Sequence, residues 1–144
     1  MDKNRKQKGN VKRETLTQEE IVRAFHMMWD NYPEMVRLID RRFNVIAGNP
    51  LYLKMGGQEG IKCNTGDPSF HRGCQAMNAL KTQETKSISS EIGGTAMESF
   101  WVPVAGAPDY YVHYTNGLAA FAAAQAAAAA PQAAAAAQET AGEE

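Results

Sequence analysis

The chain has 144 residues, a length that fits one domain with tails. Its 15 Lys and Arg nearly balance its 16 Asp and Glu, so the net charge of −1 gives no indication of nucleic-acid or membrane binding. Hydrophobic residues make up 44% of the chain, but alanine inflates this value. We therefore expect three parts: a basic disordered tail over residues 1–15, a folded domain over 16–118 and an Ala-rich low-complexity tail over 119–144.

The N-terminal tail concentrates positive charge. Its basic residues are Lys3, Arg5, Lys6, Lys8, Lys12 and Arg13, against the single acid Asp2. A solvated tail is the favoured interpretation, and an arm for nucleic acid or anionic lipid is the alternative, although no aromatic residue is present for base stacking. No apolar run follows this basic start, so no signal peptide is expected, and the two cysteines fit a reducing cytoplasm.

The first predicted helix spans residues 17–31. It begins with a capping box, in which the hydroxyl of Thr17 and the carboxylate of Glu20 satisfy each other's backbone N–H groups. An apolar stripe then follows at helical spacing: Ile21, Phe25, Met28 and Trp29. This stripe is more apolar than a lone peripheral helix requires, so it predicts a homodimer interface.

Two short strands and a helix follow. Pro33 ends the first helix, and residues 35–39 and 43–47 form strands around a turn at 40–42. Residues 50–55 form a short helix, since proline is favoured in a first helical turn.

The second half of the domain is dominated by strands. Residues 58–70 are rich in turn formers, and a helix is predicted over 71–82. Strands are predicted over 86–92, 96–104 and 110–115. Five strands with hairpins at both ends indicate one antiparallel α+β sheet with helices on one face.

The C-terminal segment is alanine-rich. Residues 119–130 are predicted as a helix because alanine is the best helix former, and Pro131 is expected to break it, with disorder beyond. Alanine is too weakly apolar for a membrane span, and Gln125 interrupts the run.

This order of elements resembles the PAS sensory domain family. The residues that carry the likeness are Tyr32-Pro33-Glu34-Met35-Val36-Arg37-Leu38-Ile39-Asp40, Val45-Ile46-Ala47-Gly48-Asn49-Pro50, Gly60-Ile61-Lys62-Cys63 and Ala79-Leu80-Lys81-Thr82-Gln83-Glu84. The resemblance implies a five-stranded sheet in the order 2-1-5-4-3, with helices enclosing a small pocket and an N-terminal amphipathic helix.

The same resemblance implies a function. PAS-like domains bind a small ligand or cofactor, dimerise and pass a conformational signal to an effector. No kinase, cyclase or DNA-binding module follows in this sequence, so a separate effector protein is the expected partner, with no nucleic acid. The alternative is a dimerisation scaffold with a filled core and no ligand.

Pocket residues are expected on one face of the strands and on the longer helix. The candidates are Val36, Leu38, Met77, Phe100, Val102, Tyr111 and His113, with the opposite strand register as the alternative. Each of these side chains also fits a plain core role. His113 alternates with Tyr110, Val112 and Tyr114, so it is expected on the face opposite to them.

Cys63, His71 and Cys74 form the candidate redox or metal site. On a helix over 71–82, His71 and Cys74 would share a face, and Cys63 could fold back toward them. The alternatives are a redox disulfide, a metal or haem site with His71 as ligand, or no role for either cysteine. A flavin is not expected, because Cys63 is followed by Asn64-Thr65-Gly66 rather than by the flavin-binding pattern of the family.

Catalytic motifs are absent from the sequence. It contains no G-x-S-x-G, no H-E-x-x-H and no phosphate-binding loop. We therefore expect a binding module and not an enzyme, with the cofactor left open between haem, a metal and a small organic ligand.

Overall fold

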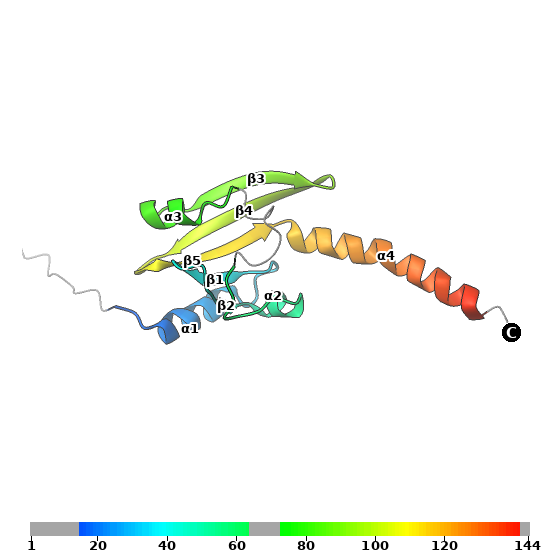
Figure 1. Cartoon of the computed structure of the whole chain (residues 1–144), viewed down its shortest axis with the longest axis horizontal. Helices are drawn as coiled ribbons and strands as arrows, with labels where there is room; N and C mark the ends of the chain where they lie inside the picture. The colour runs from blue at the N-terminus through cyan, green and yellow to red at the C-terminus, as the bar shows by residue number, and fades with distance from the viewer. Residues whose placement is uncertain (1–14, 64–72, 142–144) are drawn as a thin grey trace, which may run out of the picture.

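The computed structural model describes residues 15–63 and 73–141, with side chains as far as Ala129. Its centre is a five-stranded antiparallel sheet in the order β2-β1-β5-β4-β3 (Figure 1). The strands are β1 (Arg37–Asp40), β2 (Val45–Gly48), β3 (Lys86–Ile92), β4 (Thr95–Val104) and β5 (Ala107–Asn116). The predicted fold class and strand order are confirmed.

Helix α1 (Gln18–Trp29) packs on one face of this sheet. Thr17 caps it as predicted, because its side chain accepts from the N–H of Glu20 at 3.2 Å. Ile21 and Phe25 are each 4% exposed and belong to a core cluster with strand residues that include Leu38. These two side chains are therefore core residues of this chain and are not free to contact a second subunit.

The other residues of the predicted α1 stripe lie differently. Trp29 is partly buried against the same cluster, whereas Met28 is 77% exposed and its neighbour Met27 is 78% exposed. Trp29 belongs to an aromatic group on this face, with ring centroids 5.2 Å from Tyr32 and 5.3 Å from Tyr114. Three of the four stripe residues therefore pack inside this chain, and only Met28 is left exposed.

The opposite face of the sheet is covered by α2 (Pro50–Lys54) and α3 (Ala76–Thr82). Its core cluster consists of Ile39, Val45, Tyr52, Ala76, Ala79, Leu80, Trp101 and Tyr111. We call this side the α3 face and the other the α1 face.

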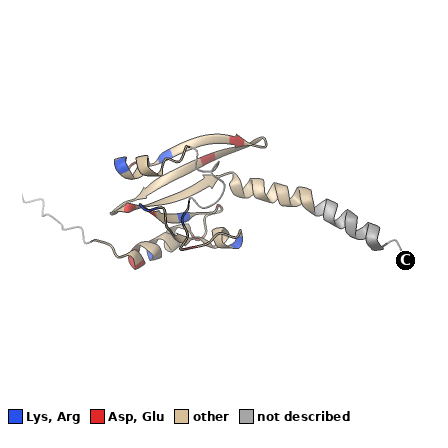
Figure 2. Ribbon diagram, in the orientation of Figure 1, with Lys and Arg blue, Asp and Glu red and all other residues tan. Residues whose placement is uncertain are grey.

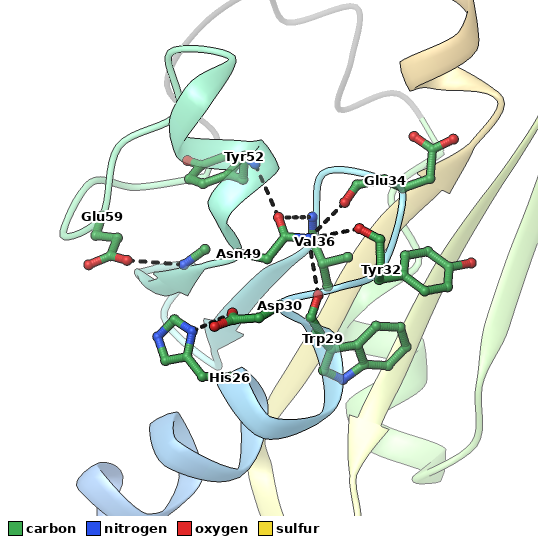
Figure 3. Close-up of polar contacts among 10 residues, drawn as sticks. His26, Trp29, Asp30, Tyr32, Glu34, Val36, Asn49, Tyr52 and Glu59 are labelled. Carbon is green, nitrogen blue, oxygen red and sulfur yellow. Dashed lines mark hydrogen bonds and ion pairs between the residues drawn. The ribbon is translucent and has the colours of Figure 1, made fainter.

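Asn49 links the end of α1 and the start of α2 to the sheet (Figure 3). It is fully buried, and its Oδ1 accepts from the backbone N–H groups of Val36 at 3.0 Å and Tyr52 at 3.1 Å. Its Nδ2 donates to the carbonyl of Glu34 at 2.8 Å, with longer contacts to two more carbonyls near the end of α1. One side chain therefore holds the exit of α1, the start of β1 and the start of α2 together.

The predicted helix over 71–82 is shorter in the structure. Residues 71 and 72 lie outside the described residues, and α3 begins at Ala76. Gly73 has φ +81°, a left-handed conformation that a continuous helix does not allow. The predicted helix therefore begins too early in the sequence.

Helix α4 (Leu118–Ala141) leads away from the body of the domain beyond β5 (Figure 1). The prediction that Pro131 ends this helix is wrong. An interior proline costs about 3 kcal/mol, but alanine runs on both sides have the highest helix propensity and continue the helix across it. Its side chains up to Ala129 carry no charge (Figure 2). None of the described helices is long and apolar enough to cross a membrane.

The start of α4 is tied to the segment before β1. Glu34 is 8% exposed, and its two carboxylate oxygens accept from the N–H groups of Gly117 and Ala119, each at 2.9 Å. The hydroxyl of Tyr32 donates to Asn116 Oδ1 at 2.8 Å. A buried carboxylate at a helix N-terminus satisfies the free N–H groups there and complements the helix dipole.

Candidate functional site

A row of polar and aromatic residues crosses the α3 face. In the strand register Lys86 pairs with Trp101, Trp101 with His113 and His113 with Arg37. Directly paired residues in an antiparallel sheet project from the same face, so these four side chains lie side by side. The row ends at Gly48, which pairs with Arg37 on the other side.

Two aromatic contacts fix the geometry of this row. The rings of Trp101 and His113 stack with centroids 4.7 Å apart and planes 14° apart. His113 Nδ1 donates to the Phe100 carbonyl at 2.8 Å, so the neutral ring has Nε2 as its acceptor nitrogen. On the other side, the Arg37 guanidinium lies 5.9 Å from the centroid of the Tyr52 ring.

Cys63 and Tyr111 lie beside this row. Tyr111 is 1% exposed, and its hydroxyl is 4.0 Å from the sulfur of the half-buried Cys63. Burial raises the pKa of both groups above their ordinary values, and the nearby positive charge of Arg37 opposes this effect. Both groups therefore stay protonated at neutral pH.

Stability is expected to fall in alkali because of these two groups. Each has a raised pKa in the folded state, so the folded chain binds more protons than the unfolded chain once the pH exceeds the ordinary values of 9.0 for Cys63 and 10.0 for Tyr111. Above pH 10, Tyr111 alone would lower the free energy of unfolding by up to about 1.4 kcal/mol per pH unit. Tyr111→Phe should flatten this decline in urea titrations between pH 8 and pH 11. An unchanged slope would contradict the assignment, and Tyr110→Phe, on the opposite face of β5, is the control.

The seven predicted pocket residues do not share one face. Tyr111 and His113 lie on the α3 face, and His113 is opposite to Tyr110, Val112 and Tyr114 as predicted. Val36, Leu38, Phe100 and Val102 lie on the α1 face, where they pack with α1 or with Tyr114. The prediction that all seven line one pocket is therefore wrong.

The error comes from the strand register. Residue 113 pairs with 101 and with 37, so the side chains that share the α3 face are Arg37, Ile39, Trp101, Tyr111 and His113. Alternation within one strand separates its two faces, but it does not show which residues of the neighbouring strand lie on each face. Met77 does not face the sheet either, since α3 buries Ala76, Ala79 and Leu80 and leaves Met77 50% exposed.

The predicted set of Cys63, His71 and Cys74 is only partly described. His71 lies outside the described residues. Cys74 precedes α3, so it does not share a helix face with His71, and it is exposed. Both cysteines are free thiols, and residues 15–63 and 73–141 contain no group of three His, Cys, Asp or Glu side chains suited to a metal ion.

The sequence reasoning missed the central residues of the α3 face: Arg37, Tyr52 and Trp101. A signal for Arg37 was present, because an arginine in the middle of a short apolar strand needs a reason to be there. Trp101 lies within the predicted strand over 96–104 and Tyr52 within the predicted helix over 50–55, and the sequence indicates no site role for either. Their grouping depends on pairings between distant segments.

Comparison with known proteins gives structural matches only. No protein-family model matches the sequence, and no curated protein does. Among solved structures, the phage VqmA–DPO complex matches with a TM-score of 0.53 and 16% identity, over 79% of this chain and 60% of that chain. The chain therefore spans less than two thirds of that protein.

Two further structures match at lower scores. A sensory box sensor histidine kinase from Vibrio cholerae has a TM-score of 0.49 and 8% identity, over 71% of this chain and 96% of that chain. The PAS domain of Bordetella pertussis BvgS has a TM-score of 0.48 and 16% identity, over 66% of this chain and 84% of that chain.

The topology of the sheet defines a fold class. The sheet has the strand order that the resemblance to PAS domains implies, and α2 and α3 cover the face on which the polar row lies. The chain has a PAS-like fold.

Proposed function

We propose that this chain is a sensory module that binds a small molecule on the α3 face of its sheet. The observation that carries the proposal is the row of Arg37, His113 and Trp101 beside Tyr52 and Tyr111. Sites for small molecules combine aromatic walls with a few converging polar groups, and this row supplies both. The similarity in fold to a protein in complex with DPO supports the same kind of function.

The output of such a module would run through α4. Arg37 on the α3 face is three residues from Glu34, whose carboxylate holds the first amides of α4. Asn49 joins the Glu34 carbonyl to the N–H of Tyr52, which borders the same face. A ligand that shifts β1 or α2 would therefore bias the direction of α4, and α4 is the element available to a separate effector protein.

Native mass spectrometry of the full chain tests ligand binding. We expect the purified protein to carry an added small-molecule mass that is lost on denaturation. DPO is the first compound to add to the chain, with the indole N–H signals of its two tryptophans as reporters in NMR. Trp101 lies on the α3 face and Trp29 on the α1 face, so only Trp101 should shift. Two results together would refute the proposal. The native mass would be that of the polypeptide alone, and neither indole signal would move on addition of DPO or of a cell-extract fraction of small metabolites.

Dimerisation through α1 remains part of the proposal in a narrower form. Ile21 and Phe25 are needed in the core, so Met27 and Met28 are the exposed apolar side chains of α1 that could contact a second subunit. Removing residues 1–31 would confuse dimerisation with folding. Met27→Glu with Met28→Glu, followed by sedimentation, is the cleaner test, and an unchanged dimer would exclude α1.

A redox role for Cys63 and Cys74 is the second candidate. A negative charge on Cys74 would raise the pKa of Cys63 and of Tyr111, which is the effect expected when the three groups are near one another. Hydrogen peroxide would take two electrons and two protons from the two thiols, and would leave a disulfide and two molecules of water.

The two cysteines should differ in reactivity. Cys74 is exposed, whereas burial raises the pKa of the half-buried Cys63 and lowers its thiolate fraction. Iodoacetamide at pH 7.5 should therefore alkylate Cys74 several times faster than Cys63, as measured by peptide mass spectrometry. In 6 M guanidinium the two rates should converge. Equal rates in the folded protein would contradict this assignment, and the absence of an intramolecular disulfide after peroxide would remove the redox candidate.

A further inference from the structure

Arg37 has an unusual position for a charged residue. It is partly buried on the α3 face at the start of β1, between Gly48 and His113 in the strand register. The ring of Tyr52 flanks its guanidinium at 5.9 Å. Such a contact with an aromatic face orients the group but satisfies none of its N–H donors.

No acidic residue pairs with this charge in the part of the chain that the structure describes. The ion pairs there are His26–Asp30, Arg41–Asp109 and Lys86–Glu84. Glu59 approaches the neighbouring strand, but its carboxylate accepts from the N–H of Gly48 at 3.3 Å. Among these residues the side chain of Arg37 also donates no hydrogen bond. The Tyr52 ring compensates only in part for the hydration that this partly buried cation loses, and an anionic ligand would supply the missing counter-ion.

We infer that the molecule bound on the α3 face is a small organic acid whose carboxylate is held by Arg37. This inference rests on the proposed function and names the class of its ligand. The planar guanidinium offers a fork of donors that matches the two oxygens of a carboxylate. The positive charge of Arg37 also reaches Cys63 and Tyr111, where it opposes the rise in pKa that burial causes.

The neighbouring rings indicate the shape of the rest of the ligand. Tyr52 lies on one side of Arg37, and the stacked pair of Trp101 and His113 lies on the other. Flat aromatic surfaces on both sides of the charge favour a planar, unsaturated body attached to the carboxylate. Benzoate is the simplest probe with both features, and benzamide is a probe of similar shape without the charge.

The experiment uses the full chain labelled with ¹⁵N and follows the indole signals of Trp101 and Trp29. Benzoate should shift Trp101 and leave Trp29 unmoved. Benzamide should bind roughly tenfold or more weakly, because a charge-assisted pair is lost. Arg37→Gln should reduce the affinity for benzoate to that for benzamide. Arg41→Gln is the matched control, since Arg41 pairs with Asp109 at the surface and should leave both affinities unchanged.

The comparison of the two probes on the unaltered chain keeps the test decisive even if Arg37→Gln folds poorly. Equal shifts of Trp101 by benzoate and benzamide would overturn the inference but leave small-molecule binding on this face standing. The inference would also be overturned, with small-molecule binding left standing, if native mass spectrometry retained a neutral compound and Trp101 did not respond to benzoate. No retained compound and no response to either probe would remove the inference and the proposed function together.

Discussion

Asn49→Ala is expected to destabilise the domain by about 3 to 5 kcal/mol. The side chain is fully buried and takes part in five hydrogen bonds, two as acceptor and three as donor (Figure 3). Its removal leaves the N–H groups of Val36 and Tyr52 and the carbonyl of Glu34 buried without these partners, at roughly 1 to 3 kcal/mol each. This loss is a large part of the 5 to 15 kcal/mol that holds a typical domain together.

Two further variants separate hydrogen bonding from lost volume. Asn49→Asp keeps the acceptor oxygen but puts a second oxygen against three carbonyls, so it should be at least as destabilising at pH 7 and should recover partly as acid protonates it. Asn78→Ala is the control, because Asn78 is exposed on α3 and bonds only to neighbours on the surface. Urea unfolding followed by circular dichroism measures all three. A cost for Asn49→Ala no larger than that for Asn78→Ala would show that Asn49 does not hold these segments.

The secondary structure could be predicted well because its signals are local. The capping residue Thr17, the Asn-Pro start of α2 and the alternation over Lys86–Ile92 each depend on neighbours in the sequence. The strand order could be predicted only through the resemblance to PAS domains, since no local pattern encodes which strands pair.

The candidate site was predicted less well because it depends on register. Tyr111 and His113 were correctly expected to share a face, but their partners on β1 and β4 were taken one residue away from Arg37 and Trp101. A shift of one residue moves every side chain to the other face of the sheet. Asn49 shows the same limit. The sequence indicates its role as the cap of α2, because that depends on the next residues, but not its hydrogen bonds to the end of α1, which lies 20 residues away.

The packing of Tyr52 joins the candidate site to the stability of the fold. Its ring is flanked by Arg37 and lies against the backbone of Gly48 and Gly57. Its hydroxyl donates to the carbonyl of Gln58 at 2.8 Å and accepts from the N–H of the same residue at 3.1 Å. The ring is therefore held at both ends and cannot move aside without breaking contacts.

Gly48→Ala is accordingly expected to cost about 3 kcal/mol or more. A Cβ atom at this position would meet Cδ1 of Tyr52 far inside van der Waals contact, and buried overpacking of this kind costs at least about 1 to 3 kcal/mol. The backbone of Gly48 does not have a positive φ, so the ring is the main obstacle to a methyl group. In a Tyr52→Ala background the same change should cost under about 0.5 kcal/mol, or stabilise slightly by restricting the unfolded chain. Urea unfolding of the four proteins in this double-mutant cycle gives the coupling directly. If Gly48→Ala is too unstable to purify, a folded double variant would carry the same information. An equal cost of Gly48→Ala in both backgrounds would show that the Tyr52 ring does not exclude a side chain at Gly48.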